Sequence, residues 1–246
     1  MDTTLYVTLS HQMAMRRYMD LIANNVANMN TTAYRREKVM FHEYLSRMTG
    51  TENPAAAEVA YVQDYGVRRD FSQGPLVATS NPLDVAISGE GFFAVERAGS
   101  GRIDYTRNGH MRISSDGFLA TETGEKVLDM SDNPIAIGTL DSNILIAADG
   151  TVSSRQGVLG RLKVVRFADP QSLQKVGQGL YRTDAAPLPA DNYTLQRGML
   201  EMSNVNPILE MTDMINVMRS YQSVARLTEQ YQELRNQGIQ QLGRVQ

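Results

Sequence analysis

The chain contains no cysteine in its 246 residues and only three histidines. The absence of cysteine excludes disulfide bonds and thiolate metal ligands. The histidines are scattered at His11, His42 and His110, and none stands at a ligand-like spacing from another. We therefore expect no metal and no cofactor.

Long apolar runs are also absent, since none approaches the roughly 18 residues that a membrane span needs. The first ten residues, Met1–Ser10, lack the basic start, the continuous apolar stretch and the small-residue cleavage site of a signal peptide. We expect a chain that is not membrane-embedded. If it leaves the cytoplasm, it uses a route without such a signal.

Neither sign of charge dominates, because 24 Lys and Arg stand against 27 Asp and Glu, a net charge of −3. General nucleic-acid binders usually show a basic surplus or a basic stripe. The balance therefore predicts no nucleic-acid partner.

Glycine and proline are missing from the first 49 residues, and the last 39 contain only Gly238 and Gly243. All eight prolines lie between Pro54 and Pro207, and 16 of the 19 glycines lie between Gly66 and Gly198. Because these residues mark turns and interrupt helices, the pattern predicts two long terminal helices around a middle of another kind.

Hydrophobic periodicity supports a first helix over about residues 3–28 and a second that begins at Pro207, a favourable first-turn residue. At 1.5 Å per residue they would be roughly 40 and 50 Å long. The apolar positions of the first are Leu5, Leu9, Met13, Met19, Ile22 and Val26. Those of the second are Met211, Met214, Ile215, Met218, Tyr221 and Ala225, continuing to Tyr231 and Leu234.

Each helix has one narrow apolar stripe, so we expect the two to pack against each other as a coiled coil. Isolated helices of this kind are marginal in water, and we expect the termini to order fully only on assembly. Twelve of the 14 methionines lie in residues 1–48 or 199–246. Methionine adapts to irregular contacts, so this segregation favours a subunit interface along both stripes, with an ordinary core as the alternative.

The middle predicts short strands at Asp84–Ile87, Phe92–Glu96, Ile144–Ala147 and Leu162–Phe167. Hairpin or turn signals follow at Asn108-Gly109, Asp116-Gly117 and Asp149-Gly150. With no helix between the strands, the expected class is α+β with an antiparallel central domain. Residues 35–80 show no clear period and are expected to form an extended linker used for interaction.

Four stretches of the chain resemble the flagellar rod and hook proteins. They are Ile22–Asn28 with Asn30–Arg35, Asn81–Phe93 with Tyr105–Gly109, Asp149–Val152 with Phe167–Pro170, and Leu200–Asn206 with Glu210–Tyr221. Together they are spread along most of the chain, from Ile22 to Tyr221, in the family order. Ala33 stands where the family usually has glycine and Val26 where it has leucine, so the local turn at Ala33 is the point of difference.

The motif residues taken from this resemblance are Asn24, Asn25, Asn28, Asn30, Thr31, Asn81, Pro82, Leu83, Asp84, Gly89, Gly91, Phe92, Phe93, Ser203, Asn204, Val205 and Asn206. The four asparagines of residues 24–30 are expected to end the first helix and to fix the path of the chain beyond it. The length and the opening, Met1–Val7, resemble the proximal rod protein most, with the distal rod protein as the alternative.

The resemblance implies a structural subunit of the basal-body rod in the periplasmic space, exported through the flagellar type III apparatus. Its partners would be other copies of itself and neighbouring axial proteins of the rod. The implied domains are an inner-tube helix (1–34), the linker (35–80), a β-rich outer domain (81–200) and a second inner-tube helix (201–246). The tube would transmit torque and carry exported subunits.

An enzyme is not expected. Ser88–Gly91 lacks the lysine and the following helix of a phosphate-binding loop, and the Asp-Gly pairs do not continue into a calcium loop. His110 beside a turn is more typical of a surface residue than of a catalytic one. A cell-wall-binding module on a helical stalk is a further alternative, because the middle contains Tyr105, Phe118, Tyr181 and Tyr193. These aromatics are spread singly, which favours core positions.

Overall fold

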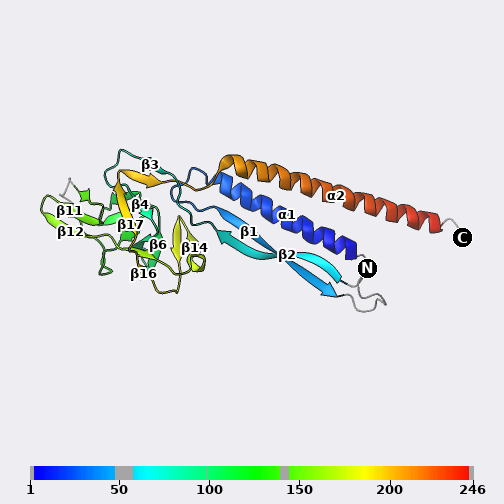
Figure 1. Ribbon diagram of the computed structural model, residues 1–246, viewed down its shortest axis with the longest axis horizontal. Coiled ribbons are helices and arrows are strands. Elements are labelled where there is room, and N and C mark those ends of the chain that lie inside the picture. Colours follow the sequence, from blue (N-terminus) through cyan, green and yellow to red (C-terminus); the bar gives the residue numbers. More distant parts are fainter. Residues whose placement is uncertain (1–2, 48–57, 98, 139–143, 244–246) are drawn as a thin grey trace. The chain divides into compact units, whose positions relative to one another are not determined.

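The computed structural model describes residues 3–47, 58–97, 99–138 and 144–243 (Figure 1). The chain forms two compact units. Unit 1 consists of residues 1–27, 37–70 and 206–246, and unit 2 consists of residues 28–36 and 71–205.

Unit 1 contains the two long helices, α1 (Thr3–Ala27) and α2 (Pro207–Gly243), and the strands β1 (Glu37–Arg47) and β2 (Glu58–Arg69). The helices run in opposite directions side by side, and α1 lies between α2 and the two strands (Figure 1). The predicted contact between the terminal helices is confirmed. Neither described helix is both long and apolar enough to cross a membrane.

Residues 35–80 were expected to form an extended linker, but residues 37–47 and 58–69 form a β-hairpin, and residues 48–57 lie outside the described part of the chain. The use of this segment for interaction stays a prediction. Strands β1 and β2 pair antiparallel from Glu37↔Arg69 to Arg47↔Glu58. The register shifts between Met40 and Phe41, because Met40 pairs with Gly66 and Phe41 with Asp64, which leaves Tyr65 as an extra residue in β2. This bulge breaks the alternation in β2, and β1 contains consecutive apolar residues at Val39, Met40 and Phe41, so neither strand shows a regular period of two.

The regular elements described in unit 2 are short strands joined by turns and irregular segments. Their bounds are β3 (Leu76–Ala78), β4 (Val85–Gly89), β5 (Phe92–Glu96), β6 (Ile103–Thr106), β7 (Met111–Ile113), β8 (Leu119–Thr121), β9 (Lys126–Val127), β10 (Leu145–Ile146), β11 (Thr151–Ser154), β12 (Gly157–Arg161), β13 (Val164–Arg166), β14 (Gln174–Gly177), β15 (Leu180–Arg182), β16 (Leu188–Pro189), β17 (Tyr193–Arg197) and β18 (Met199–Glu201), with a 3₁₀ turn, η2, at Pro170–Ser172.

A nine-stranded sheet has the order β14-β15-β6-β5-β9-β8-β7, with β13 pairing to β5 and to β16. Smaller sheets pair β10-β11-β12, β17-β4 and β18-β3. The strand pairs of the described chain are antiparallel, so the predicted α+β class with an antiparallel middle is confirmed.

Two apolar clusters form the core of unit 2. The larger contains Val85, Ile87, Phe93, Val95, Met111, Leu119, Val127 and Leu162 among others. The smaller is aromatic and includes Phe92, Tyr105, Phe167 and Tyr181. Adjacent residues Phe92 and Phe93 enter different clusters, because neighbouring side chains of a strand point to opposite faces.

Two of the three predicted turns close hairpins. Asp116-Gly117 lies between the paired strands β7 and β8, and Asp149-Gly150 between β10 and β11. Asn108-Gly109 does not, because β6 and β7 are not neighbours in the sheet. Gly109 instead allows close packing: a Cβ atom there would lie 1.6 Å from the carbonyl oxygen of Val85.

Candidate assembly surface

Helix α2 begins with a well-formed cap. The Oδ1 atom of Asn206 accepts hydrogen bonds from the backbone N–H groups of Ile208 (3.1 Å) and Leu209 (3.4 Å). Pro207 occupies the first helical position, where a missing N–H costs nothing. The last residues of one motif therefore define where the second helix starts.

Asn25 of α1 joins the three parts of unit 1. Its Nδ2 atom donates to the carbonyl oxygen of Glu37 (2.8 Å) and to Oε2 of Glu210 in α2 (3.1 Å), and its Oδ1 accepts from the N–H of Glu37 (3.0 Å). Asn25 and Glu210 are both buried. One motif asparagine thus fixes the end of α1 against the start of β1 and the start of α2.

The hairpin is held at the same place by an ion pair. Glu37 accepts from Nε of Arg69 at 3.1 Å, across the first registered pair of β1 and β2. Both side chains are largely shielded from solvent.

The buried side chains of unit 1 are few and belong mainly to positions that periodicity did not select. They are Ala14, Leu21, Ile22, Asn25, Glu210 and Val217. Of the predicted stripes, only Ile22 is fully buried. Met19, Val26, Met214, Tyr221 and Ala225 are partly buried, and the side chain of Leu5 lies outside the described part of the chain.

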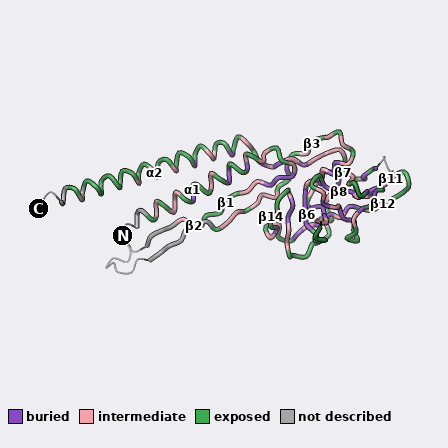
Figure 2. The backbone as a smooth tube through the Cα atoms, turned by 180° about the vertical axis from the view of Figure 1, so that it is seen from behind, coloured by how far each residue is buried: buried purple, intermediate pink, exposed green. Residues whose placement is uncertain are grey.

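The remaining stripe residues stay exposed, so the expectation that helix pairing hides both stripes is wrong for them. On α2 they are Met211, Ile215 and Met218, and further along the helix Tyr231 and Leu234. Ile208 is exposed too, and spacings of three, four and three residues place it on one helix face with Met211, Ile215 and Met218. On α1 they are Leu9 and Met13, and Tyr6, which was not among the predicted positions, is exposed on the same face. Figure 2 shows α2 exposed along most of its length.

We define the apolar face of α2 as Ile208, Met211, Ile215 and Met218, and the apolar face of α1 as Tyr6, Leu9 and Met13. Monomeric proteins rarely expose contiguous apolar patches of this kind unless another molecule covers them. In the described structure, the two faces are the clearest candidates for contact with a partner.

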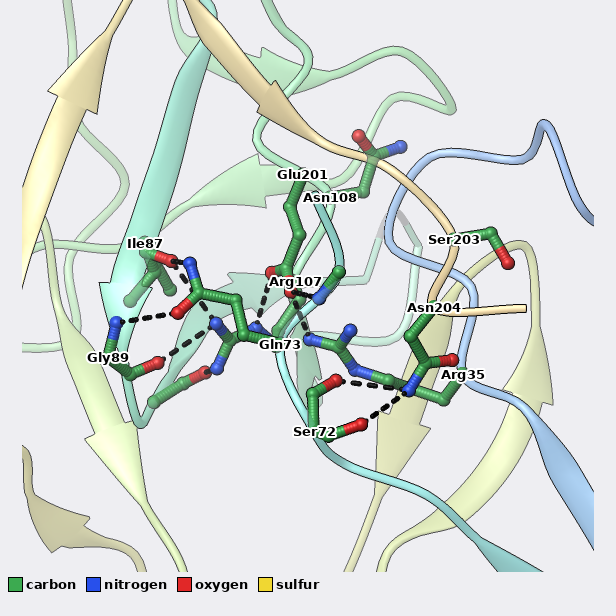
Figure 3. Close-up of polar contacts among 12 residues, drawn as sticks. Arg35, Ser72, Gln73, Ile87, Gly89, Arg107, Asn108, Glu201, Ser203 and Asn204 are labelled. Carbon is green, nitrogen blue, oxygen red and sulfur yellow. Dashed lines mark hydrogen bonds and ion pairs between the residues drawn. The ribbon is translucent and has the colours of Figure 1, made fainter. Parts of the chain in front are cut away.

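In unit 2, the motif residues converge on a buried carboxylate, Glu201, at the end of β18 (Figure 3). Its Oε1 atom accepts from Nη2 of Arg35 (2.7 Å) and from the N–H of Gly74 (2.8 Å). Its Oε2 atom accepts from Nε of Arg107 (2.8 Å). Three segments far apart in sequence meet at this one side chain.

The two arginines of this cluster differ in how well they are satisfied. Arg107 also donates to the carbonyl oxygens of Ile87, Gly89 and Gly91 at 2.9–3.2 Å. Burial lowers the pKa of its guanidinium, and the nearby Glu201 carboxylate opposes that shift. Arg35 is completely buried, and its Nε and Nη1 atoms have no hydrogen-bond partner among the described residues. The cluster carries two positive charges against one negative charge.

Asn204 extends the cluster along the backbone. Its Oδ1 atom accepts from the N–H of Arg36 (2.7 Å), and its Nδ2 donates to the carbonyl oxygen and hydroxyl of Ser72 (3.0 and 3.2 Å). Ser203 is buried and its hydroxyl accepts from the N–H of Val205, which is also buried.

The chain between α1 and Arg35 makes a compact turn in unit 2. The N–H of Thr31 donates to the carbonyl oxygen of Asn28 (3.1 Å), and the Thr31 hydroxyl to its side chain (3.2 Å). Asn24 in α1 and Asn30 are both exposed. Ala33 is buried with φ = 57°, the left-handed region that favours glycine. One of the two positions that depart from the pattern of the resemblance is therefore a point of backbone strain.

A second polar group is centred on Asp84, which is buried beside β4. Its carboxylate accepts from the Asn81 amide (2.7 Å) and the Thr79 hydroxyl (2.7 Å), and lies 2.8 Å from Nδ1 of His110. Leu83 packs against the larger core cluster, while Pro82 is exposed. His110 therefore belongs to a structural group.

Two motif glycines are needed for backbone geometry. Gly89 has φ = 111°, and a Cβ there would lie 2.4 Å from the carbonyl oxygen of Asn192. Gly91 has φ = 148°, and a Cβ would lie 2.6 Å from Val164. Both also present their carbonyl oxygens to Arg107.

The chemistry that this arrangement supports is structural. Glu201 bonds both arginines and the N–H of Gly74, and Arg107 also bonds backbone carbonyl oxygens, whereas Arg35 is bonded to Glu201 through Nη2. Among the described residues no group of three or more His, Cys, Asp or Glu is placed to hold a metal ion. A cavity of about 250 Å³ is lined by Phe71, Glu90, Gly91, Phe92, Arg107, Arg166, Phe167, Ala168 and Pro170. Arg107, one of its lining residues, donates four hydrogen bonds, to Glu201 and to the carbonyl oxygens of Ile87, Gly89 and Gly91.

Arg35, Arg107 and Glu201 lie within the sequence motifs, but the sequence did not predict a role for them. A charge adjacent to a motif carries no signal of burial, because burial depends on segments that meet only in the fold. The same holds for Glu210 and Val217 of α2.

Three family models match the chain. A model described as flagella basal body rod protein matches residues 5–35. The D1 domain of the flagellar hook protein FlgE/F/G matches residues 86–154, and the C-terminal domain of the flagellar basal body rod FlgEFG protein matches residues 196–242.

Full-length relatives agree with these matches. The flagellar basal-body rod protein FlgF of Caulobacter vibrioides is 38% identical over 247 residues, with 100% of each chain covered. FlgF of Mesorhizobium japonicum is 32% identical, with 99% of each chain covered. The flagellar basal-body rod protein FlgG of Bacillus subtilis is 31% identical, covering 91% of this chain and 93% of the relative.

Proposed function

The chain belongs to the flagellar basal-body rod protein family and is a structural subunit of the rod, and from this premise we propose that it polymerises through the exposed apolar faces of α1 and α2. The observation that carries the proposal is the apolar face of α2, which remains about half exposed although the helix is already packed against α1.

The size of this face favours an array over a single pair. Burying the remaining half of each of its four side chains contributes about 1 kcal/mol per residue, hence about 4 kcal/mol per copy. Association of two proteins costs on the order of 4–15 kcal/mol in lost freedom before any contact is gained. One contact of this size is therefore weak. A subunit becomes stably held when several neighbours cover both helices at once.

In this proposal unit 1 forms the inner tube and unit 2 stands outside it. A head-to-tail contact that does not close on itself produces a helical array, the form required for an axial tube. Such a tube transmits torque and leaves a path for exported subunits. The partners are other copies of the chain, neighbouring proximal rod proteins and the distal rod protein, after export through the flagellar type III apparatus into the periplasmic space.

The position proposed within the rod is proximal. The two FlgF relatives align over 99–100% of both chains, whereas the FlgG relative of Bacillus subtilis leaves 9% of this chain unmatched. The distal position is the alternative. Electron microscopy of basal bodies from a strain that lacks the gene separates the two. Rings without a completed rod support the proximal position, and a short rod that stops before the hook supports the distal one.

The cell-wall-binding alternative is not favoured, because an aromatic binding row would be exposed. Tyr105 and Tyr181 are buried in the aromatic cluster. Phe118 and Tyr193 are only partly exposed.

The polymerisation proposal is tested by Met218→Asp, which places a charge on the apolar face of α2. The side chain is about half exposed in the folded subunit, so the subunit stays folded while its incorporation into rods fails. The matched control is Met130→Asp, an equally exposed methionine of unit 2. Met214→Asp, at a partly buried position, also blocks incorporation. Normal motility with Met218→Asp overturns the proposal.

A further inference from the structure

The methionines of the chain differ sharply in exposure. Met13 on the apolar face of α1 is 65% exposed, and Met211 and Met218 on the apolar face of α2 are 52% and 45% exposed. Met111, in the core of unit 2, is 1% exposed, and Met130, on the surface of unit 2, is 53% exposed. Three exposed methionines of unit 1 therefore lie on the faces proposed for assembly, whereas Met40 of β1, which is 37% exposed, lies outside them.

We propose that Met13, Met211 and Met218 form an oxidation site in the free subunit, and that their conversion to sulfoxides blocks assembly. The proposal rests on the function given above. The oxidant is a peroxide, and assembly is lost because the modified residues lie on the apolar faces of α1 and α2.

The reaction balances without any other co-reactant. A lone pair of the thioether sulfur attacks one oxygen of hydrogen peroxide, and the O–O bond breaks. The sulfur loses two electrons and gains an S=O bond, while the other oxygen leaves as water. Enzymes of the sulfoxide-reductase class restore the thioether. The modification is therefore reversible in a cell that supplies them.

The position of these residues decides the effect. Met211 and Met218 are seven residues apart, two helical turns, and so lie on the same face of α2 with Ile208 and Ile215. A sulfoxide is polar, and burying it against apolar side chains without a hydrogen-bond donor opposes association. We expect each sulfoxide to weaken subunit contact about tenfold, since one unsatisfied buried polar group has an effect of this order.

Assembly itself removes the site. Once neighbouring subunits cover the apolar faces, peroxide no longer reaches the thioethers. Sensitivity to peroxide is therefore confined to the subunit before its incorporation into the rod. Met130 of unit 2 is an exposed methionine that is not part of the proposed assembly faces.

The first measurement uses the purified full-length chain and hydrogen peroxide, followed by peptide mass spectrometry. Met13, Met211, Met218 and Met130 are expected to oxidise at least about ten times faster than the buried Met111. Equal rates for exposed and buried methionines would overturn the site.

The second measurement follows rod assembly in cells during a brief peroxide pulse. A triple variant, Met13→Leu, Met211→Leu and Met218→Leu, keeps the apolar volume and is expected to assemble during the pulse when the natural chain does not. Met130→Leu, the matched control, should give no protection. Equal loss of rods in the triple variant and the natural chain would overturn the proposal.

The two proposals fail in different ways. Normal incorporation of Met218→Asp removes the apolar face of α2 as an assembly surface. If that variant fails while chains with Met211 and Met218 as sulfoxides are found in finished rods, the assembly surface stands and the oxidation proposal falls.

Discussion

Substitution of Glu201 by glutamine should destabilise unit 2 strongly, because this carboxylate is the one negative charge that two buried guanidinium groups share. Glutamine has nearly the same shape but accepts hydrogen bonds on one side only. The carboxylate accepts on both, from Arg35 and Gly74 at Oε1 and from Arg107 at Oε2. In either orientation, the new NH₂ group faces an N–H donor.

The magnitude follows from the loss of one member of a buried ion pair, about 3–5 kcal/mol. With a urea dependence of about 2 kcal/mol per molar, a loss of about 4 kcal/mol lowers the unfolding midpoint by roughly 2 M. The assay is urea unfolding of the full chain, with hydrogen exchange of the β5 peptide to report on unit 2. The matched control is Asp132→Asn, since the Asp132–Lys163 pair is more exposed and should lose at most about 1 kcal/mol.

A double variant tests whether the charges of Arg35 and Glu201 are energetically coupled. Arg35→Met combined with Glu201→Gln should lose less stability than the sum of the single changes, because the two groups interact directly at 2.7 Å. A loss below about 1 kcal/mol for Glu201→Gln alone would show that the cluster does not hold unit 2 together, and strict additivity would show that the two charges are not coupled.

Three further substitutions test local geometry. Ala33→Gly should raise the free energy of unfolding by about 0.5–1 kcal/mol, because φ = 57° strains alanine. The control Ala94→Gly, in strand β5, should lower it. Both changes are measured as shifts of the urea unfolding midpoint, and a lower midpoint for Ala33→Gly would contradict the strain. Gly109→Ala should lower the midpoint of thermal unfolding sharply, because its Cβ would lie 1.6 Å from a carbonyl oxygen of β4. The control Gly160→Ala, whose Cβ would have no atom nearer than 3.5 Å, should be tolerated. Equal unfolding midpoints for the two variants would refute the close approach at Gly109. Asn25→Ala removes three hydrogen bonds and should lower the stability of unit 1 by about 3 kcal/mol. The loss is measured as faster hydrogen exchange of the backbone amides in α1. Unchanged exchange would show that Asn25 does not hold α1 in place.

The helical ends and the antiparallel middle could be predicted because each depends on local sequence. Long stretches free of glycine and proline permit only long regular elements, and Asp-Gly pairs favour the turns seen at residues 116–117 and 149–150. The hairpin was missed because neither strand alternates regularly: β1 contains consecutive apolar residues, Val39–Phe41, and β2 contains a bulge at Tyr65. The Asn108-Gly109 turn was misread, since a glycine needed for close packing looks the same in sequence as one needed for a hairpin.

The candidate assembly surface was predicted only in part. Periodicity identified Met211, Ile215 and Met218 as apolar positions of a helix, but it did not show which apolar positions the chain itself buries. The fold buries Val217 and Glu210 and leaves those three exposed. The burial of α1 by both α2 and the hairpin shifts the buried side of that helix, so that Leu9 and Met13 face outward.

The sequence by itself determined the two helices, the antiparallel class of the middle and the family, because composition, periodicity and contiguous motifs are all local properties. The tertiary structure alone decided that Glu201 joins Arg35 to Arg107 and that Asn25 joins α1 to β1 and α2. These contacts connect residues up to 185 positions apart. A charged group or an amide joins distant segments only when those segments bury it together with its partners. The local sequence pattern does not indicate which segments will do so.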